Sequence, residues 1–266
     1  MVNELYDSLE TDSSIIALKT LTKKLPEPIV ILGGWAVYLT VNESFEEEHG
    51  RSYLGSKDVD IGFHIDLNMS KQELKNSNFG RAIEILKSIG YIPSGTSRFS
   101  RIIYRETGEK ITEEQAKTIP IHDLFYQYVD LILDQIHPRH SDIFSIKPID
   151  EPILINAFKE NIFKEITFED ETIFLPNPEI LLATKLKAFP DRDKEDKKIK
   201  DACDIYALLW NSEVDFKYLI NLLKKLFPGL CSNIMGILEN DISIEASKHL
   251  GIDKEIYEDV IKYLID

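Results

Sequence analysis

The chain has 266 residues, 43% of them hydrophobic, and a formal net charge of −15 at pH 7. This length is enough for one large or two modest domains with hydrophobic cores. The acidic excess argues against broad, nonspecific nucleic-acid binding, because that affinity comes mainly from Lys and Arg neutralising phosphates. No apolar run approaches the roughly 20 residues that span a membrane, and the acidic start lacks the regions of a signal peptide. We therefore expect a cytoplasmic protein without a membrane partner.

The first part of the chain combines a helix with a short strand. Residues 13–25 have the apolar spacing of an amphipathic helix, and residues 28–32 (PIVIL) are typical of a buried strand. Gly33 and Gly34 follow directly. Glycine lets the main chain approach a ligand closely, so the pair is a candidate for backbone N–H contacts to phosphate, although such a pair usually marks a turn. The acidic run in residues 43–55 is interpreted as a solvated loop.

The most informative pattern is in residues 55–65 (GSKDVDIGFHI). As a strand, this segment places Asp58 and Asp60 on one face and its apolar side chains on the other. Carboxylates so close together repel each other unless a cation neutralises them, and Mg²⁺ with oxygen ligands would do so. The alternative is an exposed edge strand with two solvated acids. Ser56 is either a hydroxyl donor to phosphate or a turn residue.

A second helix and two hairpins are predicted from further patterns. Residues 79–91 have helical periodicity with Gly90 as the C-terminal cap, and residues 98–112 and 165–175 have the pattern of hairpins. The arginines that are candidates for phosphate or acceptor contacts are Arg98, Arg101, Arg105 and Arg192.

A third candidate carboxylate lies in residues 125–134 (FYQYVDLILD), which alternate as a strand. Asp130 shares a face with Tyr126 and Tyr128. A carboxylate in so apolar a run is costly unless it is paired or bound to a metal. Asp134 continues the same face, but it lies at the strand end and is more easily solvated, so it ranks second.

The pattern changes near residues 175–179 (LPNPE), after which nearly every segment has helical periodicity. Asn177 is expected to cap a helix that begins at Pro178. We therefore predict two domains, an α+β domain in residues 1–176 and a helical domain in residues 177–266.

Two helices of this second part carry candidate polar residues. Lys185 has apolar neighbours at helical spacing, so either its stem passes from a core edge to water or its amine contacts a triphosphate. Asp201 and Asp204 share a helix face. They either belong to the site or pair with neighbouring lysines on a solvated surface.

In combination, the glycine pair, the Asp58-x-Asp60 motif and Asp130 resemble the DNA polymerase beta-type nucleotidyltransferase superfamily. GGWAV and KDVDIGF are similar to segments of the aminoglycoside and lincosamide nucleotidyltransferases. PEILLATKLKAF, followed by KD and DIYALL, resembles the C-terminal half of AbiEii-type abortive-infection toxins. Two features depart from the pattern: the interval from Gly34 to Asp58 is long, and a glycine stands where a serine usually follows the first glycine.

The resemblance implies an α+β nucleotidyltransferase core followed by a helical domain, with an NTP held in the cleft between them. It implies that the catalytic and metal-binding residues are Asp58, Asp60 and Asp130, with Mg²⁺ or Mn²⁺ as cofactor in a two-metal site. It implies that the nucleotide-binding residues are Gly33, Gly34, Lys185 and Asp201, and Ser56 is the candidate to replace the missing serine hydroxyl.

The implied reaction is transfer of an NMP from an NTP to an acceptor hydroxyl, with release of pyrophosphate. The acceptor stays open among an RNA end such as that of a transfer RNA, a protein and a small molecule. Whether the protein acts in a toxin–antitoxin pair also stays open. The alternative is a catalytically silent relative that binds a nucleotide or a protein partner and regulates it.

Overall fold

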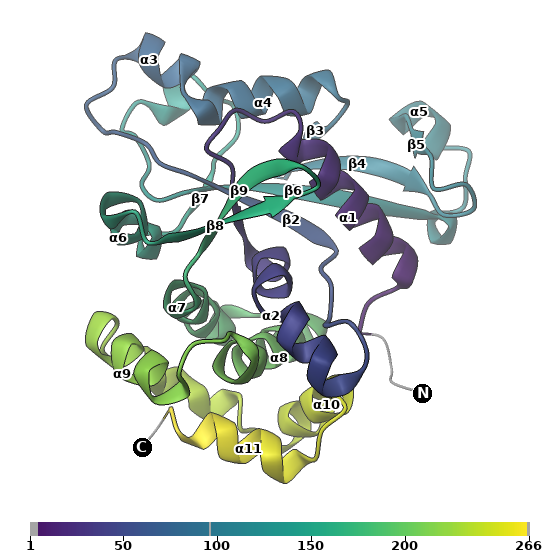
Figure 1. Cartoon of the computed structure of the whole chain (residues 1–266). Helices are drawn as coiled ribbons and strands as arrows, with labels where there is room; N and C mark the ends of the chain where they lie inside the picture. The colour runs from purple at the N-terminus through teal and green to yellow at the C-terminus, as the bar shows by residue number, and fades with distance from the viewer. Residues whose placement is uncertain (1–4, 96, 265–266) are drawn as a thin grey trace. The chain divides into compact units, whose positions relative to one another are not determined.

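The computed structural model describes residues 5–95 and 97–264, and its contacts group these residues into two compact units. The sheet unit contains Tyr6–Gly33 and Ser56–Leu175, and the helical unit contains Gly34–Gly55 and Pro176–Asp266. Figure 1 shows the elements of both units by colour and label. The division at residue 176 stays a prediction, and the contacts place Gly34–Gly55 with the later helices.

The strands of the described residues form one mixed sheet in the order β3-β4-β6-β2-β1-β9-β8, with β5 beside β4 and β7 beside β6. Their bounds are β1 (Val30–Leu32), β2 (Asp58–Phe63), β3 (Ile92–Ser94), β4 (Arg98–Tyr104), β5 (Lys110–Ile111), β6 (Leu124–Leu133), β7 (Ile149–Asp150), β8 (Phe163–Phe168) and β9 (Glu171–Pro176). At the centre, β2 is antiparallel to β1 and parallel to β6, and β6 is antiparallel to β4. The predicted buried strand and the two alternating strands are confirmed as β1, β2 and β6.

Of the helices in the sheet unit, α1 and α4 lie on the apolar face of β2 and β6. The helices are α1 (Ser8–Thr22), α3 (Lys71–Asn76), α4 (Asn78–Ser88), α5 (Glu113–Ala116) and α6 (Ile153–Glu160), with the 3-10 turns η1 (Ile121–Asp123) and η2 (His140–Asp142). Phe79 of α4 packs edge-on against Phe63 of β2, with 5.8 Å between ring centroids. The side-chain amide of Gln127 donates to the hydroxyl of Ser13 in α1, at 2.7 Å. The predicted fold class, α+β with a mixed sheet flanked by helices and later helices, is confirmed.

Both predicted hairpins form. β4 and β5 pair as antiparallel strands around Gly108, whose φ is +70°. β8 and β9 are neighbours in the sheet, joined by Glu169 and Asp170 at positive φ, as in the tight turns that suit the twist of a hairpin. The first helix begins earlier than predicted because Asp7 caps it and accepts a hydrogen bond from the Leu9 amide at 2.9 Å.

The helical unit is built around α8. Its helices are α2 (Gly33–His49), α7 (Pro178–Ala188), α8 (Glu195–Asn211), α9 (Phe216–Leu226), α10 (Asn240–Leu250) and α11 (Lys254–Lys262), with the 3-10 turns η3 (Phe189–Asp191) and η4 (Leu230–Gly236). α8 is buried without interruption from Ile199 to Leu209 and contacts α7, α10 and α11. Tyr206 of α8 stacks on Tyr257 of α11, with 5.6 Å between ring centroids.

The helix α2 corrects one prediction, because the acidic run in residues 43–55 is helical as far as His49 and is not a loop. Val41 and Phe45, one turn apart, are fully buried, while Glu46 and its acidic neighbours are exposed. Packing of one face therefore extends the helix through a run of glutamates, which are good helix formers. This continuation accounts for the long interval between the glycine pair and the Asp-x-Asp motif.

The helix predicted after the change in pattern begins at Pro178, as expected. Asn177 is at its N-cap, but its side chain makes no capping hydrogen bond. In the described part of the chain, every helix is too short or too polar to cross a membrane.

Candidate functional site

The parallel pairing of β2 and β6 brings the predicted carboxylates of the sheet unit together. Asp60 is directly opposite Asp130 in the register, and Asp58 is opposite Tyr128. Neighbouring strands lie about 4.8 Å apart. Residues two apart on a strand, and residues directly opposite each other on neighbouring strands, point to the same face of the sheet. Asp58, Asp60 and Asp130 therefore lie side by side on one face of the sheet, opposite to the face that α1 and α4 cover.

Gly33 lies against the carboxylate of Asp60. Leu32 of β1 is opposite Asp60 in the register, so the chain leaves β1 at this point, with φ of +62° at Gly33. A Cβ atom at Gly33 would stand 1.8 Å from Oδ2 of Asp60, which is far inside van der Waals contact. The position requires glycine for its backbone conformation and for the close approach of the carboxylate.

Arg98 is the cation of this cluster. It is opposite Asp130 in the pairing of β4 with β6. Its Nε donates to Oδ1 of Asp130 at 3.0 Å and its Nη2 bonds the second oxygen, while Nη2 is 3.7 Å from Oδ2 of Asp58. Burial lowers the pKa of Arg98, but the hydrogen bonds and charge of Asp130 outweigh it, so the pKa lies above its usual value.

The donor set suits a hard divalent cation in part. Among the described residues, no group of three or more His, Cys, Asp or Glu side chains is arranged to hold a metal ion, and Arg98 engages the carboxylate of Asp130. Asp58 and Asp60 fit Mg²⁺, which proteins commonly bind through one or two carboxylates together with substrate phosphates.

The other hairpin arginines point elsewhere. Nε of Arg101 donates to the side chain of Gln127, and the Arg105 guanidinium bonds Asp7 and Glu10, each at 2.6 Å. Strand alternation separates Arg98 from these two, as the sequence indicates. The sequence does not show the register between β4 and β6, so it could not single out Arg98 as the partner of Asp130.

Asp134 is fully buried at the end of the sheet, so the expectation that it is more easily solvated is wrong. Its buried carboxylate accepts a hydrogen bond from the Ile65 amide at 3.1 Å and lies 2.6 Å from Nδ1 of His64. Because Asp130 and not Asp134 is opposite Asp60 in the register, Asp130 remains the candidate third carboxylate.

Ser56 and Gly34 have local structural roles. The Ser56 hydroxyl donates to the main-chain carbonyl of Asp58 at 3.1 Å, which matches the turn role considered for it. Gly34 is buried in the first turn of α2. Contact of either residue with phosphate stays a prediction.

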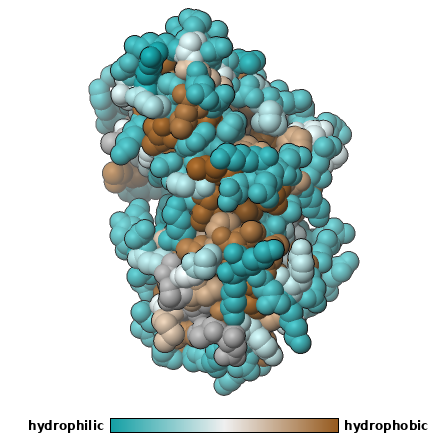
Figure 2. Space-filling model, turned by 90° about the vertical axis from the view of Figure 1, so that its left-hand side faces the viewer, coloured by the Kyte–Doolittle hydropathy of each residue, from teal (hydrophilic) through white to brown (hydrophobic). Residues whose placement is uncertain are grey.

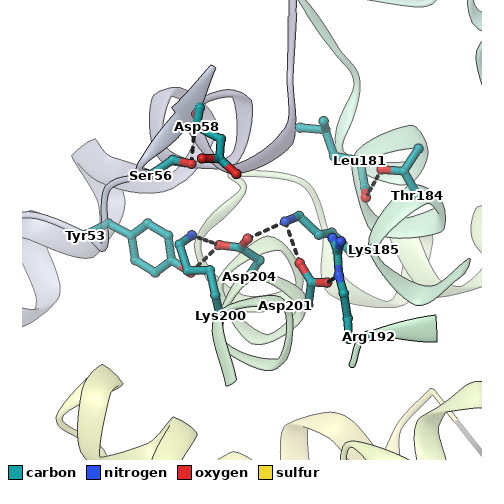
Figure 3. A network of polar contacts seen from close by, with 10 residues as sticks. All are labelled: Tyr53, Ser56, Asp58, Leu181, Thr184, Lys185, Arg192, Lys200, Asp201 and Asp204. Carbon is teal, nitrogen blue, oxygen red and sulfur yellow. Dashed lines mark hydrogen bonds and ion pairs between the residues drawn. The ribbon is translucent and has the colours of Figure 1, made fainter. Parts of the chain in front are cut away.

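The predicted polar residues of the helical unit form a buried ion network (Figure 3). Nζ of Lys185 is 2.7 Å from Oδ1 of Asp201 and 2.7 Å from Oδ2 of Asp204. Nε of Arg192 is 2.6 Å from the second oxygen of Asp201. The Lys185 side chain is 9% exposed, so its amine contacts neighbouring carboxylates and does not reach water along the stem.

The other side of Asp204 is held by Lys200 and Tyr53. Lys200 bonds Oδ1 of Asp204, and the Tyr53 hydroxyl donates to the same oxygen at 2.8 Å. Burial is the largest cause of the lowered pKa of Lys200 and of the raised pKa of Tyr53. The acids therefore do pair with lysines, but in a buried network and not on a solvated surface.

Two opposing effects act on the central pair of this network. Burial alone would lower the pKa of Lys185 and raise that of Asp201. The opposite charges outweigh burial, so the pKa of Lys185 is raised and that of Asp201 is lowered. Both groups are held in their charged forms, and a role for either in binding nucleotide stays a prediction.

A separate pocket of about 420 Å³ lies on the apolar face of the sheet, opposite to the face that carries Asp58, Asp60 and Asp130. Apolar side chains such as Ile83 of α4, Phe99 of β4 and Phe144 line it, together with charged residues of α3 and α4. Figure 2 shows hydrophobic side chains gathered among hydrophilic ones on the face that it draws. None of the predicted site residues lines this pocket.

No protein-family model matches the chain, and no curated protein matches it. Among solved structures, it is similar to an antigenic nucleotidyltransferase-like protein from Paracoccidioides brasiliensis. The similarity has a TM-score of 0.41 and 17% sequence identity, and it covers 85% of this chain and 92% of the other. A likeness of this degree does not carry an activity from one protein to another. The resemblance to AbiEii-type toxins and to antibiotic nucleotidyltransferases stays a prediction.

Proposed function

We propose that the protein is a metal-dependent nucleotidyltransferase, which transfers an NMP from an NTP to an acceptor hydroxyl and releases pyrophosphate. The observation that carries this proposal is the register that sets Asp60 beside Asp130, with Asp58 on the same face and Gly33 against Asp60. Three carboxylates next to a bare stretch of main chain suit a triphosphate that arrives with a divalent cation.

Asp58 and Asp60 would hold Mg²⁺ or Mn²⁺. When bound, the ion would neutralise charge on the phosphates and polarise the phosphoryl group. Gly33 lets the main chain approach the phosphates, and α2 begins at this residue. The N–H groups at the start of a helix favour anions, so the β- and γ-phosphates would bind there.

Asp130 would accept the proton of the attacking hydroxyl. The acceptor oxygen forms a bond to the α-phosphorus while the bond to the pyrophosphate oxygen breaks, roughly in line. For this role Asp130 must exchange its bonds with Arg98 for a bond with the acceptor. The released guanidinium of Arg98 would then stabilise charge on the transferred phosphoryl group.

The remaining nucleotide-binding assignments are secondary parts of the proposal. Lys185 would contact the triphosphate while it stays bonded to Asp201, and Gly34 and Ser56 would add contacts near the phosphates. An alternative function is nucleotide binding without transfer. It is favoured by one observation, the pair of hydrogen bonds from the Arg98 guanidinium to the Asp130 carboxylate, which a silent protein would keep.

Two measurements test the proposal, calorimetry of NTP binding with Mg²⁺ or EDTA, and transfer of label from an α-labelled NTP to acceptors in a cell extract. Asp58→Asn together with Asp60→Asn should lower binding and transfer by at least about 100-fold, because several kcal/mol of charge stabilisation is lost. The matched control is Asp12→Asn, an exposed acid of α1, which should leave both unchanged.

The outcomes separate the two functions. Equal NTP affinity in EDTA and in Mg²⁺ would contradict a metal site at Asp58 and Asp60. Asp130→Asn should retain NTP binding and lose transfer. If the wild type binds Mg²⁺-NTP tightly but labels no acceptor, the silent alternative holds instead.

A further inference from the structure

Two tyrosines lie on the carboxylate-bearing face of β6. Tyr126 and Tyr128 stack with 6.1 Å between ring centroids and an interplanar angle of 15°. Tyr126 is 47% exposed, although a strand in the middle of a sheet usually buries its large side chains. The guanidinium carbon of Arg98 lies 4.4 Å from the centroid of the Tyr128 ring. The guanidinium thus covers part of the Tyr128 ring and leaves Tyr126 as the more exposed ring of the pair, and we call the two rings the tyrosine shelf.

The register places this shelf relative to the carboxylates. Tyr128 is opposite Asp58 on one side and Ser100 on the other, and Tyr126 is one step farther along the same face. Gly33 follows β1, which is on the opposite side of β2 from β6. The shelf and Gly33 therefore lie on opposite sides of the Asp-x-Asp strand.

This arrangement separates two halves of the proposed reaction. In an in-line displacement, the attacking oxygen and the leaving pyrophosphate are on opposite sides of the α-phosphorus. If the β- and γ-phosphates bind at Gly33, the acceptor approaches from the side of β6. That side carries Asp130 and the tyrosine shelf.

The chemistry of the shelf selects its ligand. Aromatic rings with an exposed part stack on planar rings such as nucleic-acid bases. Because the chain has a net charge of −15, long contact with a phosphate backbone is disfavoured. A neutral planar ring meets no such penalty.

We infer that Tyr126 and Tyr128 form an acceptor subsite that stacks the base of a nucleoside and so brings the nucleoside's hydroxyl to Asp130. This inference rests on the proposed function and narrows it, since it makes the acceptor a molecule with a base one sugar away from the reacting hydroxyl. The terminal nucleoside of a longer acceptor and a free nucleoside share this chemistry.

The test is a binding measurement with the uncharged probes adenosine and cytidine, without NTP or metal. Binding is monitored by fluorescence or NMR. Tyr126→Leu keeps an apolar side chain and removes the ring, so adenosine should bind about 5- to 150-fold more weakly, the range that corresponds to stacking of one base. Tyr126→Phe keeps the ring and should bind as the wild type does. Tyr218→Leu, at an exposed tyrosine of α9, is the matched control and should have no effect.

The outcomes distinguish this inference from the proposed function. The variant with Asp58→Asn and Asp60→Asn should lose transfer and still bind adenosine. Failure of adenosine and cytidine to bind the wild type, or equal binding by Tyr126→Leu, overturns the inference. A fall in NTP affinity in Tyr126→Leu also overturns it, because the rings would then hold the donor base. An oligonucleotide that binds as tightly as adenosine, and no tighter, identifies the terminal nucleoside as the whole ligand.

Discussion

The two units each contain a cluster of aspartates and cations, and the clusters differ mainly in how the charges are shared. In the helical unit, Asp201 and Asp204 have side chains 3% and 0% exposed, and three cations surround them. In the sheet unit, the side chains of Asp58 and Asp130 are 13% and 6% exposed, and Arg98 faces these two carboxylates and that of Asp60.

The difference separates a structural network from a site that can exchange its partners. A buried carboxylate that keeps several cationic partners is strongly destabilised when one is removed, because a buried charge loses its compensation. Where several carboxylates share one guanidinium, negative charge is in excess, and a ligand cation that neutralises it is favoured. We therefore expect the larger effect on folding from the helical network and the larger effect on the proposed chemical step from the sheet cluster.

The largest expected effect is on the buried network. Lys185→Met should lower the free energy of unfolding by about 3–5 kcal/mol, because Asp201 and Asp204 stay buried with one cation fewer. A lysine whose amine contacted only a triphosphate would give no such loss without ligand, because a methionine keeps the apolar stem. Urea unfolding measures this loss. The control is Lys198→Met, at a half-buried lysine on the same helix as Asp201, which should change the free energy of unfolding little. A variant as stable as the wild type would remove the structural role of the network.

The next effect concerns the close approach at Gly33. Gly108→Ala meets no atom within 4 Å and should cost about 1–2 kcal/mol for its positive φ alone. Gly33→Ala carries the same strain and also overlaps the Asp60 carboxylate, which adds about 1–3 kcal/mol. Thermal melts compare the two variants, and NTP binding should fall only in Gly33→Ala. Equal costs in both would show that Asp60 moves aside freely.

Arg98→Gln tests whether the sheet cluster exchanges its cation. Loss of the bonds to Asp130 should cost about 1.5–3 kcal/mol, the range for hydrogen bonds between charged groups. Because Mg²⁺ would take over the neutralisation, millimolar Mg²⁺ should restore part of the melting temperature in this variant. The same addition should not restore Lys185→Met. If Mg²⁺ raises both melting temperatures equally or neither, the contrast between the clusters fails.

The smallest expected effect is the acid dependence of the helical network. Because the charges of Lys185 and Arg192 outweigh burial, the pKa of Asp201 is lowered in the folded state. A lowered carboxyl pKa stabilises the fold above the ordinary value of about 3.9, and this contribution is lost as the pH falls through the folded-state pKa. In urea unfolding between pH 6 and pH 3, the wild type should lose stability more steeply than Asp201→Asn. Parallel curves would mean that Asp201 has the same pKa in both states.

Much of the local structure follows from residue patterns. Alternation in residues 55–65 and 125–134 gives the two central strands, and the carboxylates share a face because side chains on a strand alternate. Helical periodicity likewise gives α7 and α8. The acidic run after Phe45 was misread because its charges suggested solvent, whereas buried residues on one face keep it helical.

Sequence patterns are enough to show which residues share a face within one strand or helix, because that depends on fixed local geometry. They thereby identify Asp58 with Asp60 and Asp201 with Asp204 as pairs. They do not show which strands are neighbours or in which register, because pairing between distant segments depends on the packing of the whole sheet. That register joins Asp60 to Asp130 and Asp130 to Arg98, and helix packing likewise joins Lys185 to both aspartates of α8.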